Sequence, residues 1–424
     1  MRTIFALTVA VATLAATAAD ATQYKPLHAF CGLNNCSDGS KPWATPTGDG
    51  AGNYYGTTYS GGAPSDSGTV YRMHYDGTRW VYSRVHVFCT KMDCPDGAHP
   101  RAQLIVGTDG TLYGTASDGG RYGWGTIFSI APDGSGWTYK VLHHFCAKSG
   151  CPDGARPTYA GLSYQGQQPG ALYDGTSPLY GTTVNGGSQN QGTVYTLTPG
   201  ATKWTQKVIH NFCSEASCAD GGQVDAPVTV DAMGRVFGTT TVGGDYNHGN
   251  IFALTHGAAW HYTSLYSFCA GGGFCSDGDG AVSQLVVDGQ GDLIGTTYFG
   301  GAHAKGSVFK LVPNGAHSTF STLYSFCAQA NCADGQNPQA SVTLDAQGRL
   351  YGTTYGGGSG NKGTVFKLSG ANLSTFTSLH SFGTTTTSGS YPTAGLALDM
   401  SGTLYGLTIT GGANDLGLFY SIAP

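Results

Sequence analysis

The chain has 424 residues, a formal net charge of −5 at pH 7 and only 11% charged side chains. This balance excludes a polybasic protein that binds nucleic acid or an anionic membrane surface. Glycine accounts for 68 residues, yet 40% of the chain is apolar and 12% is aromatic, which is enough to build a core. No apolar stripe at helical spacing lasts more than about two turns after the N-terminus. The composition therefore favours an all-β protein with many tight turns.

Residues 1–21 have the pattern of a secretory signal peptide. Met1 and Arg2 precede an apolar run over residues 4–14, and the small residues that follow offer cleavage sites after Ala18 and Ala21. We expect cleavage after Ala21 and a mature chain, 22–424, that is secreted to the extracellular space or the periplasm. No later segment approaches the roughly 18 apolar residues of a membrane-spanning helix, so we expect no membrane span. We also expect a monomer without a nucleic-acid partner.

One unit recurs seven times along the rest of the chain. The string Tyr-Gly-Thr-Thr, or a near variant of it, begins at Tyr55, Tyr113, Tyr180, Phe237, Ile294, Tyr351 and Tyr405. Successive copies lie 54 to 67 residues apart. Each unit holds strand-like segments separated by turn residues, normally four of them, which predicts one antiparallel sheet per unit. A period of this length with four strands per unit is typical of a propeller blade.

The two ends of the repeat array favour a closed ring over an open stack. The seventh unit, residues 392–424, has only the first three segments, while the missing fourth, residues 23–30, stands alone at the mature N-terminus. Pairing of that segment with the last unit closes the ring and removes an exposed strand edge. We therefore predict one domain, an all-β seven-bladed propeller of four-stranded antiparallel blades, closed by the N-terminal strand pairing into the last blade. The third unit carries about ten extra residues within 165–178, which we expect to form a longer surface loop.

The cysteines occur in register with the repeat. Each pair follows the Phe that ends the fourth segment and precedes an Asp-Gly dipeptide; the pairs are Cys31 and Cys36, Cys89 and Cys94, Cys146 and Cys151, Cys213 and Cys218, Cys269 and Cys275, and Cys327 and Cys332. One interpretation is six two-thiolate metal sites, each completed by a histidine three residues upstream, such as His86 before Cys89. The other is six local disulfides. We favour disulfides, because no unit supplies four metal ligands and Tyr266 and Tyr324 replace the histidine while the cysteines remain. We expect no bound metal and no cofactor.

Two polar positions recur in the same register. The aspartates of the Asp-Gly dipeptides could be read as a ring of calcium ligands, but their repetition beside glycine fits an Asx-type turn better; they are Asp38, Asp96, Asp153, Asp220, Asp277 and Asp334. A histidine recurs at one place in the outer segment, at His28, His86, His143, His210 and His380. A residue present in nearly every unit indicates a structural role, since catalysis needs an asymmetric set of groups.

The repeat resembles a known family. The stretch Leu350-Tyr351-Gly352-Thr353-Thr354, followed by Gly-Gly and by Gly363-Thr364-Val365-Phe366-Lys367-Leu368, is similar to the GloVer tandem-repeat family of secreted bacterial proteins. The resemblance covers nearly the whole mature chain and implies an extracellular repeat protein, and it carries over no catalytic residue. The turn at residues 345–350 also resembles the blades of NHL and streptogramin-lyase propellers, which supports the fold only.

The residues most free to bind a ligand lie in the loop between the second and third segments of each unit. In six of the seven units this loop consists of Gly-Gly, four variable residues and a closing Gly. Loop tips that vary on a constant frame are typical of a scaffold that presents different side chains to a ligand. One tip combines a guanidinium with two amphipathic rings suited to stacking on a sugar: Arg121, Tyr122 and Trp124. A second candidate set comes from neighbouring tips of the fourth and fifth units: Asp245, Tyr246, His248, His303 and Lys305. The alternative is that the tips vary because nothing constrains them.

Three functional hypotheses follow from these residues. The first is a secreted, disulfide-stabilised propeller that binds an extracellular polysaccharide or other glycan through Arg121, Tyr122, Trp124, Asp245, Tyr246 and His248. The second is a polysaccharide lyase or glycoside hydrolase, in which base, acid and cation are supplied by His248, Tyr246, His303 and Lys305. The third is a structural or adhesive extracellular protein without catalysis.

Overall fold

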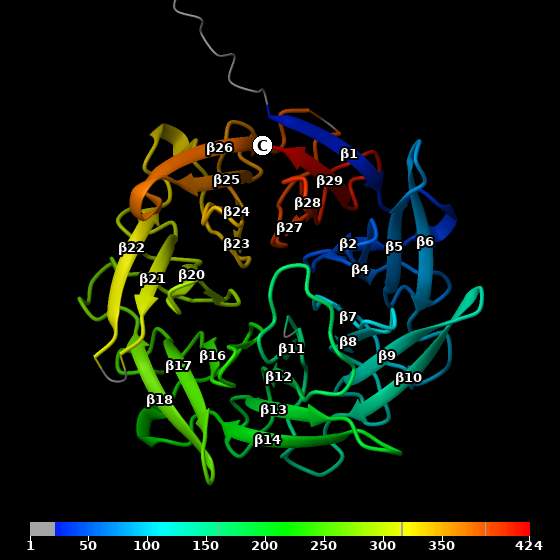
Figure 1. Cartoon of the computed structure of the whole chain (residues 1–424), viewed down its shortest axis with the longest axis horizontal. Helices are drawn as coiled ribbons and strands as arrows, with labels where there is room; N and C mark the ends of the chain where they lie inside the picture. Colours follow the sequence, from blue (N-terminus) through cyan, green and yellow to red (C-terminus); the bar gives the residue numbers. More distant parts are fainter. Residues whose placement is uncertain (1–21, 160, 315–316, 386) are drawn as a thin grey trace, which may run out of the picture.

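The computed structural model describes residues 22–159, 161–314, 317–385 and 387–424, so the predicted signal peptide lies outside the described residues. Figure 1 shows seven sheets arranged as blades around one axis, with the shortest strands nearest the centre and the longest at the rim. The described residues contain no α-helix, only four short 3-10 turns: η1 (Asn34–Cys36), η2 (Ala216–Cys218), η3 (Ala330–Cys332) and η4 (Ala371–Leu373). The prediction of an all-β, seven-bladed propeller is confirmed.

The strands follow the repeat in chain order. The first blade contains β2 (Ser40–Pro42), β3 (Thr47–Gly48), β4 (Asn53–Ser60), β5 (Thr69–Tyr75) and β6 (Trp80–Val87). The second contains β7 (Ile105–Val106), β8 (Leu112–Ala116), β9 (Thr126–Asp133) and β10 (Gly136–His144). The third contains β11 (Ser163–Tyr164), β12 (Leu179–Thr183), β13 (Thr193–Thr198) and β14 (Thr205–Asn211). The fourth contains β15 (Thr229–Val230), β16 (Val236–Thr239), β17 (Asn250–His256) and β18 (Trp260–Ser267).

The remaining three blades repeat this pattern. The fifth contains β19 (Val286–Val287), β20 (Leu293–Thr297), β21 (Ser307–Val312) and β22 (Thr319–Ser325). The sixth contains β23 (Thr343–Leu344), β24 (Leu350–Thr354), β25 (Thr364–Ser369) and β26 (Thr375–Ser381). The seventh contains β27 (Ala397–Leu398), β28 (Leu404–Thr408), β29 (Leu418–Ala423) and the N-terminal β1 (Gln23–Ala29). The first blade has an extra short strand, because β2 and β3 both pair with β4; the other blades have a single antiparallel bridge in place of β2.

The glycine of the Tyr-Gly-Thr-Thr string is required by the neighbouring strand. Gly56 in β4 lies directly opposite Tyr71 in β5, and the fully buried Tyr71 ring covers it. The same pairing of glycine with Tyr or Phe recurs in all seven blades, and a Cβ on any of these glycines would overlap the ring. The motif is therefore a socket for a large aromatic side chain within each sheet.

The first threonine of the string links neighbouring blades. Its hydroxyl donates to a backbone carbonyl in the segment that leads to the next blade's innermost strand, as in Thr57 to Ala102 (3.4 Å) and Thr182 to Ala226 (2.9 Å). Equivalent hydrogen bonds join the second, fourth, fifth and sixth blades to the blade that follows each of them. Leu407 replaces this threonine in the seventh blade, where it packs in an apolar cluster with Tyr54 and Tyr71 of the first blade.

The core lies between blades rather than within one. A typical cluster combines Tyr55, Val70 and Phe88 of the first blade with Leu104 and Phe128 of the second. The phenylalanine that precedes each cysteine pair, and its counterpart in the seventh junction, is fully buried in all seven positions; these are Phe30, Phe88, Phe145, Phe212, Phe268, Phe326 and Phe382. Each blade thus buries its apolar faces only against its two neighbours, which makes ring closure a condition of stability.

The N-terminal strand closes the ring as predicted. β1 pairs antiparallel with β29 from Gln23 opposite Ala423 to Ala29 opposite Leu418, and Figure 1 shows β1 beside β29, next to the C-terminus. The Tyr24 hydroxyl donates to the Ser388 carbonyl at 2.8 Å, and the Tyr24 ring stacks on His380 with centroids 3.9 Å apart.

The insertion in the third blade is the expected longer surface loop, and it also contacts both neighbouring blades. Tyr173 is fully buried, its N–H donates to the Val106 carbonyl and its carbonyl accepts from Thr108, both at 2.9 Å. At the other end of the insertion, Gly166 donates to the Val230 carbonyl at 3.0 Å. The insertion therefore bridges the innermost strands of the second and fourth blades. Most of its residues are exposed, so the predicted surface loop is confirmed, and the structure adds that the loop is tied to both neighbouring blades.

All six predicted disulfides are present, and the described residues hold no free cysteine. The bonds join Cys31 with Cys36, Cys89 with Cys94, Cys146 with Cys151, Cys213 with Cys218, Cys269 with Cys275, and Cys327 with Cys332. All twelve cysteines have a left-handed backbone, with φ between 45° and 67°, which turns each short loop back on itself. The carbonyl of the second cysteine accepts two N–H groups, as Cys94 does from Gly97 at 2.9 Å and from Gly120 at 2.8 Å. The cysteines are therefore structural, and the two-thiolate metal interpretation is excluded.

The aspartate after each cysteine pair does not form the expected forward Asx turn. It instead accepts N–H groups from earlier in its own loop, as Asp38 does from Gly32 at 3.0 Å and from Leu33 at 3.2 Å. The outer-strand histidine or tyrosine reaches the same carboxylate in six junctions, at 2.7–3.3 Å. These aspartates and histidines are structural, and the predicted structural role of the histidines agrees with this geometry.

The ring closure can be tested at Tyr24. Tyr24→Phe removes the bond to Ser388 and keeps the ring, so we expect a loss of about 1 kcal/mol in the free energy of unfolding. Tyr75→Phe is the matched control, because that side chain is 48% exposed. Urea unfolding followed by tryptophan fluorescence measures both variants. Equal stability of the two variants would show that the Tyr24 hydroxyl plays no part in closure.

Candidate functional site

The loop tips and the disulfide loops lie on one face of the ring, here called the disulfide face. In each of the first six blades the second glycine of the Gly-Gly pair donates to the carbonyl of the second cysteine, as Gly62 does to Cys36 at 2.8 Å and Gly187 to Cys151 at 2.9 Å. The last residue before the closing glycine of the tip also contacts the next blade. Its carbonyl accepts an N–H from the junction segment there, as Trp124 accepts from Arg156 at 3.0 Å.

A cationic and aromatic cluster lies where these junction segments approach the central axis on the disulfide face. The Arg101 guanidinium carbon lies over three rings, 4.1 Å from the centroid of Tyr59, 5.4 Å from Tyr159 and 5.7 Å from Trp43. Its Nη1 donates to the Tyr159 hydroxyl at 3.2 Å. All four side chains are half-buried. We call them the Arg101 cage; they come from the first, second and third blades.

The cage contains donors that the protein does not use. The Nε–H of Arg101 and the Nε1–H of Trp43 are shielded from solvent and have no hydrogen-bond partner among the described residues. Within the same described ranges, Arg101 forms no salt bridge. Buried donors without partners are costly, so these groups are suited to an external acceptor.

Asp225 of the fourth blade is the acidic group near the cage. It lies in the junction segment at the position that Arg101 occupies in the second blade, four residues before the innermost strand. Burial raises the pKa of Asp225 to about 7, although the positive charge of Arg101 acts in the opposite direction. A carboxyl group that titrates near neutrality can accept or donate a hydrogen bond at physiological pH.

The first predicted tip adjoins this cluster. Trp124 and Tyr122 are 39% and 40% exposed, with Arg156 over the Trp124 ring at 5.2 Å and Arg121 over the Tyr122 ring at 5.7 Å. Arg156 also lies 4.0 Å from Asp118.

A chain of contacts joins this tip to the cage. Ser117, next to Asp118, donates to the His99 carbonyl at 2.9 Å, and the His99 ring packs on Tyr59 with centroids 4.7 Å apart. The tip and the cage thus form one surface over the first three blades, here called the aromatic arc. It comprises Trp43, Tyr59, His99, Arg101, Arg121, Tyr122, Trp124, Arg156 and Tyr159.

The second predicted set is not assembled into one site. His248 Nδ1 lies 3.1 Å from Asp279, and Asp245 accepts from Ser267 at 3.1 Å. Tyr246 is 49% exposed. His303 and Lys305 are exposed on the next tip, and no contact within the described ranges joins their side chains to His248. The lyase or hydrolase arrangement of base, acid and cation has no geometric support in this cluster.

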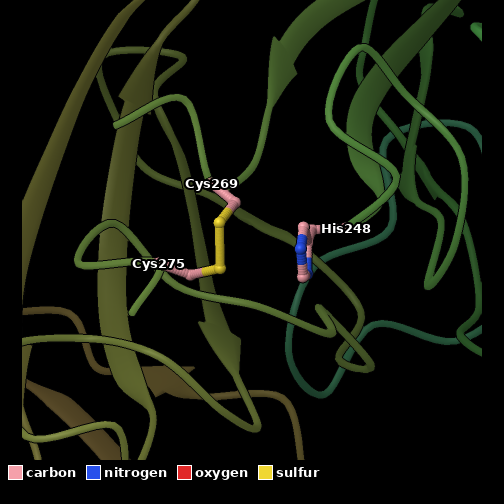
Figure 2. Close-up of side chains that lie close together, drawn as sticks. All are labelled: His248, Cys269 and Cys275. Carbon is pink, nitrogen blue, oxygen red and sulfur yellow. A yellow bond between two sulfur atoms is a disulfide. The ribbon is translucent and has the colours of Figure 1, made fainter. Parts of the chain in front are cut away.

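Figure 2 shows His248 beside the Cys269–Cys275 disulfide. One ligand atom from each of the three residues lies within 4.8 Å of the others, a spacing that a metal ion could span. The two sulfur atoms are bonded to each other, however, and a disulfide offers no thiolate to a metal. The cluster is therefore a histidine packed on a disulfide.

A large cavity opens on the opposite face, with a volume of about 2360 Å³. Its rim includes turn aspartates such as Asp231 and Asp345, whose carboxylates accept N–H groups of their own turns and bind the arginines four residues later. These acids are already paired. The cavity is lined by none of the aromatic arc residues.

Sequence reasoning missed four residues in the segments between each Asp-Gly and the innermost strand, which the repeat comparison treated as connectors: Trp43, Arg101, Tyr159 and Asp225. The sequence contained a signal for them, because an alignment of the seven junction segments places these four residues at the same position of the repeat, four residues before the innermost strand. The other blades carry Val282, Gln339 and Thr393 there. Only the ring shows that these positions converge on the axis.

The chain is similar to several known proteins. A family model described as the Gloeobacter/Verrucomicrobia repeat matches residues 8–178 and 168–420. A search among curated proteins finds no sequence match. Among solved structures, PorZ of Porphyromonas gingivalis, described as a bacterial surface component of the type-IX secretion system, is 14% identical with a TM-score of 0.51. The alignment covers 89% of this chain but 46% of PorZ, so this chain spans about half the length of that protein.

Two other solved structures are less similar. A putative 6-phosphogluconolactonase from Bacteroides uniformis is 11% identical with a TM-score of 0.46, over 79% of this chain and 83% of that one. A sialidase from Trypanosoma rangeli is 11% identical with a TM-score of 0.42, over 82% and 56% of the two chains. At these identities the likeness to PorZ shows the propeller fold alone. Within the described residues, no helix has the length and hydropathy needed to cross a membrane.

The raised pKa of Asp225 predicts a pH-dependent stability. The folded chain holds this proton up to about pH 7, whereas the unfolded chain loses it near pH 4, so wild-type stability falls as the pH rises through this window. Asp225→Asn removes the free-energy cost of ionising this buried carboxyl group. It should therefore raise the free energy of unfolding at pH 8 by roughly 1–3 kcal/mol, with little change at pH 4. Urea unfolding at both pH values measures this. Asp93→Asn, at an exposed position, is the control; a gain of the same size at pH 4 would contradict the argument.

Proposed function

The chain belongs to the Gloeobacter/Verrucomicrobia repeat family, and we propose that it is a secreted propeller that binds an extracellular glycan along the aromatic arc. The signal-peptide pattern of residues 1–21 and the six disulfides both support export to an oxidising compartment. In this proposal the mature protein, residues 22–424, acts as a monomer. The surface description of PorZ agrees with such a location.

The observation that carries the proposal is the Arg101 cage. Sugars are bound by stacking of their apolar faces on aromatic rings and by hydrogen bonds from side chains that flank the rings. The cage offers rings from three blades together with the unpaired donors of Arg101 and Trp43. Trp124 and Tyr122 add two exposed rings to this surface, on which further sugar units of a chain could stack.

The proposal keeps part of the predicted site and gives up another part. Arg121, Tyr122 and Trp124 stay in it, joined by the cage residues. The set around Asp245, Tyr246 and His248 lies in the fourth blade, whereas the arc covers the first three, so we do not assign it to the same ligand.

Calorimetric titration of the mature protein against a panel of neutral and acidic polysaccharides tests the proposal. Trp43→Ala and Trp124→Ala should each weaken binding about tenfold or more, because each removes a stacking surface. Tyr75→Ala is the control, since Tyr75 is an exposed ring in the β5–β6 hairpin and lines the cavity on the opposite face. If no polysaccharide binds, or if the two tryptophan variants bind like wild type, the protein is not a glycan binder of this kind.

A further inference from the structure

The aromatic arc is cationic although the whole chain is acidic. The chain has a net charge of −5, yet Arg101, Arg121 and Arg156 all lie along the arc. Among the described residues only Arg156 of these three forms an ion pair, at 4.0 Å from Asp118, although Asp225 lies close enough to Arg101 to interact with it electrostatically. The arc therefore has a local excess of positive charge that would attract an anionic ligand.

The orientation of Arg101 selects the kind of anion. Its guanidinium carbon lies 4.1 to 5.7 Å from the centroids of the Tyr59, Tyr159 and Trp43 rings, and Arg101 forms no salt bridge among the described residues. One edge group, Nη1, donates to Tyr159, and Nε–H has no partner. A carboxylate is the planar acceptor that matches the edge of a guanidinium with two parallel hydrogen bonds.

The neighbouring acid leaves this edge free. No hydrogen bond or salt bridge within the described ranges joins Asp225 to Arg101, although the two groups interact electrostatically. Tyr159 is the other titratable group that senses the charge of Asp225.

We propose that the Arg101 cage recognises the carboxylate of a uronic acid residue in the bound glycan. This inference rests on the proposed function, because it names the chemical class of the glycan that binds to the arc. Arg101 pairs with the carboxylate, Tyr59 and Trp43 hold the guanidinium in place, and Trp124 stacks on a neighbouring sugar unit.

A paired titration tests the charge requirement. Oligogalacturonate should bind the mature protein at least tenfold more tightly than the same oligosaccharide after reduction of its carboxylates to alcohols. Arg101→Gln should abolish this difference. Arg101→Lys should retain only part of it, because lysine keeps the positive charge but lacks the planar pair of N–H donors that matches a carboxylate. Arg79→Gln is the matched control, since it removes the same charge from a residue that lines the cavity on the opposite face.

The outcomes separate the inference from the function on which it rests. Equal binding of the two oligosaccharides, with loss of both in Trp124→Ala, would overturn the inference and leave glycan binding intact. Binding of neither oligosaccharide nor any other polysaccharide would overturn both. A sulfated neutral oligosaccharide that binds as tightly as oligogalacturonate would show that any anion suffices and would overturn the carboxylate assignment.

Discussion

The hydrogen bond from the first threonine of the repeat to the next blade, present in six of the seven blades, is the constraint on which the site depends. Thr57 is bonded to the carbonyl of Ala102, and Thr182 to that of Ala226. These carbonyls belong to the residues directly after Arg101 and Asp225. The bond that sets one blade beside the next therefore also fixes the backbone from which the arginine and the aspartate reach the mouth of the ring.

The rest of the repeat builds a rigid frame around this bond. The aromatic ring over the motif glycine fills each sheet, and the outer-strand histidine or tyrosine reaches the aspartate of the disulfide loop. His380 is the exception, because the seventh junction has no cysteines and no Asp-Gly; it stacks on Tyr24, and burial lowers its pKa to about 4. These groups are occupied in holding the frame, so the chemistry available to a ligand lies in the non-repeated residues of the junctions and tips.

A ring of nearly equivalent blades acquires a site by asymmetry. Seven junction segments approach one axis, but the cage takes its four side chains from the first three blades. The insertion of the third blade adds to this asymmetry, since Tyr173 binds it to the second blade and Gly166 to the fourth. The ring thus supplies a common geometry, while single substitutions in a few copies supply the chemistry.

The sequence by itself determined the architecture. The period of the Tyr-Gly-Thr-Thr string, the lone outer segment at residues 23–30 and the registered cysteines predict the seven blades, their closure and the disulfides, because each is a local pattern repeated along the chain. The tertiary structure decided which side chains meet. Arg101 lies 58 residues after Trp43 and 58 residues before Tyr159. The three side chains are in contact only because the ring turns successive junctions toward one axis. His248 and Lys305 are just as regularly spaced, yet no hydrogen bond or ion pair among the described residues joins their side chains. Convergence at the centre of a closed ring is a property of its curvature, which no single repeat contains.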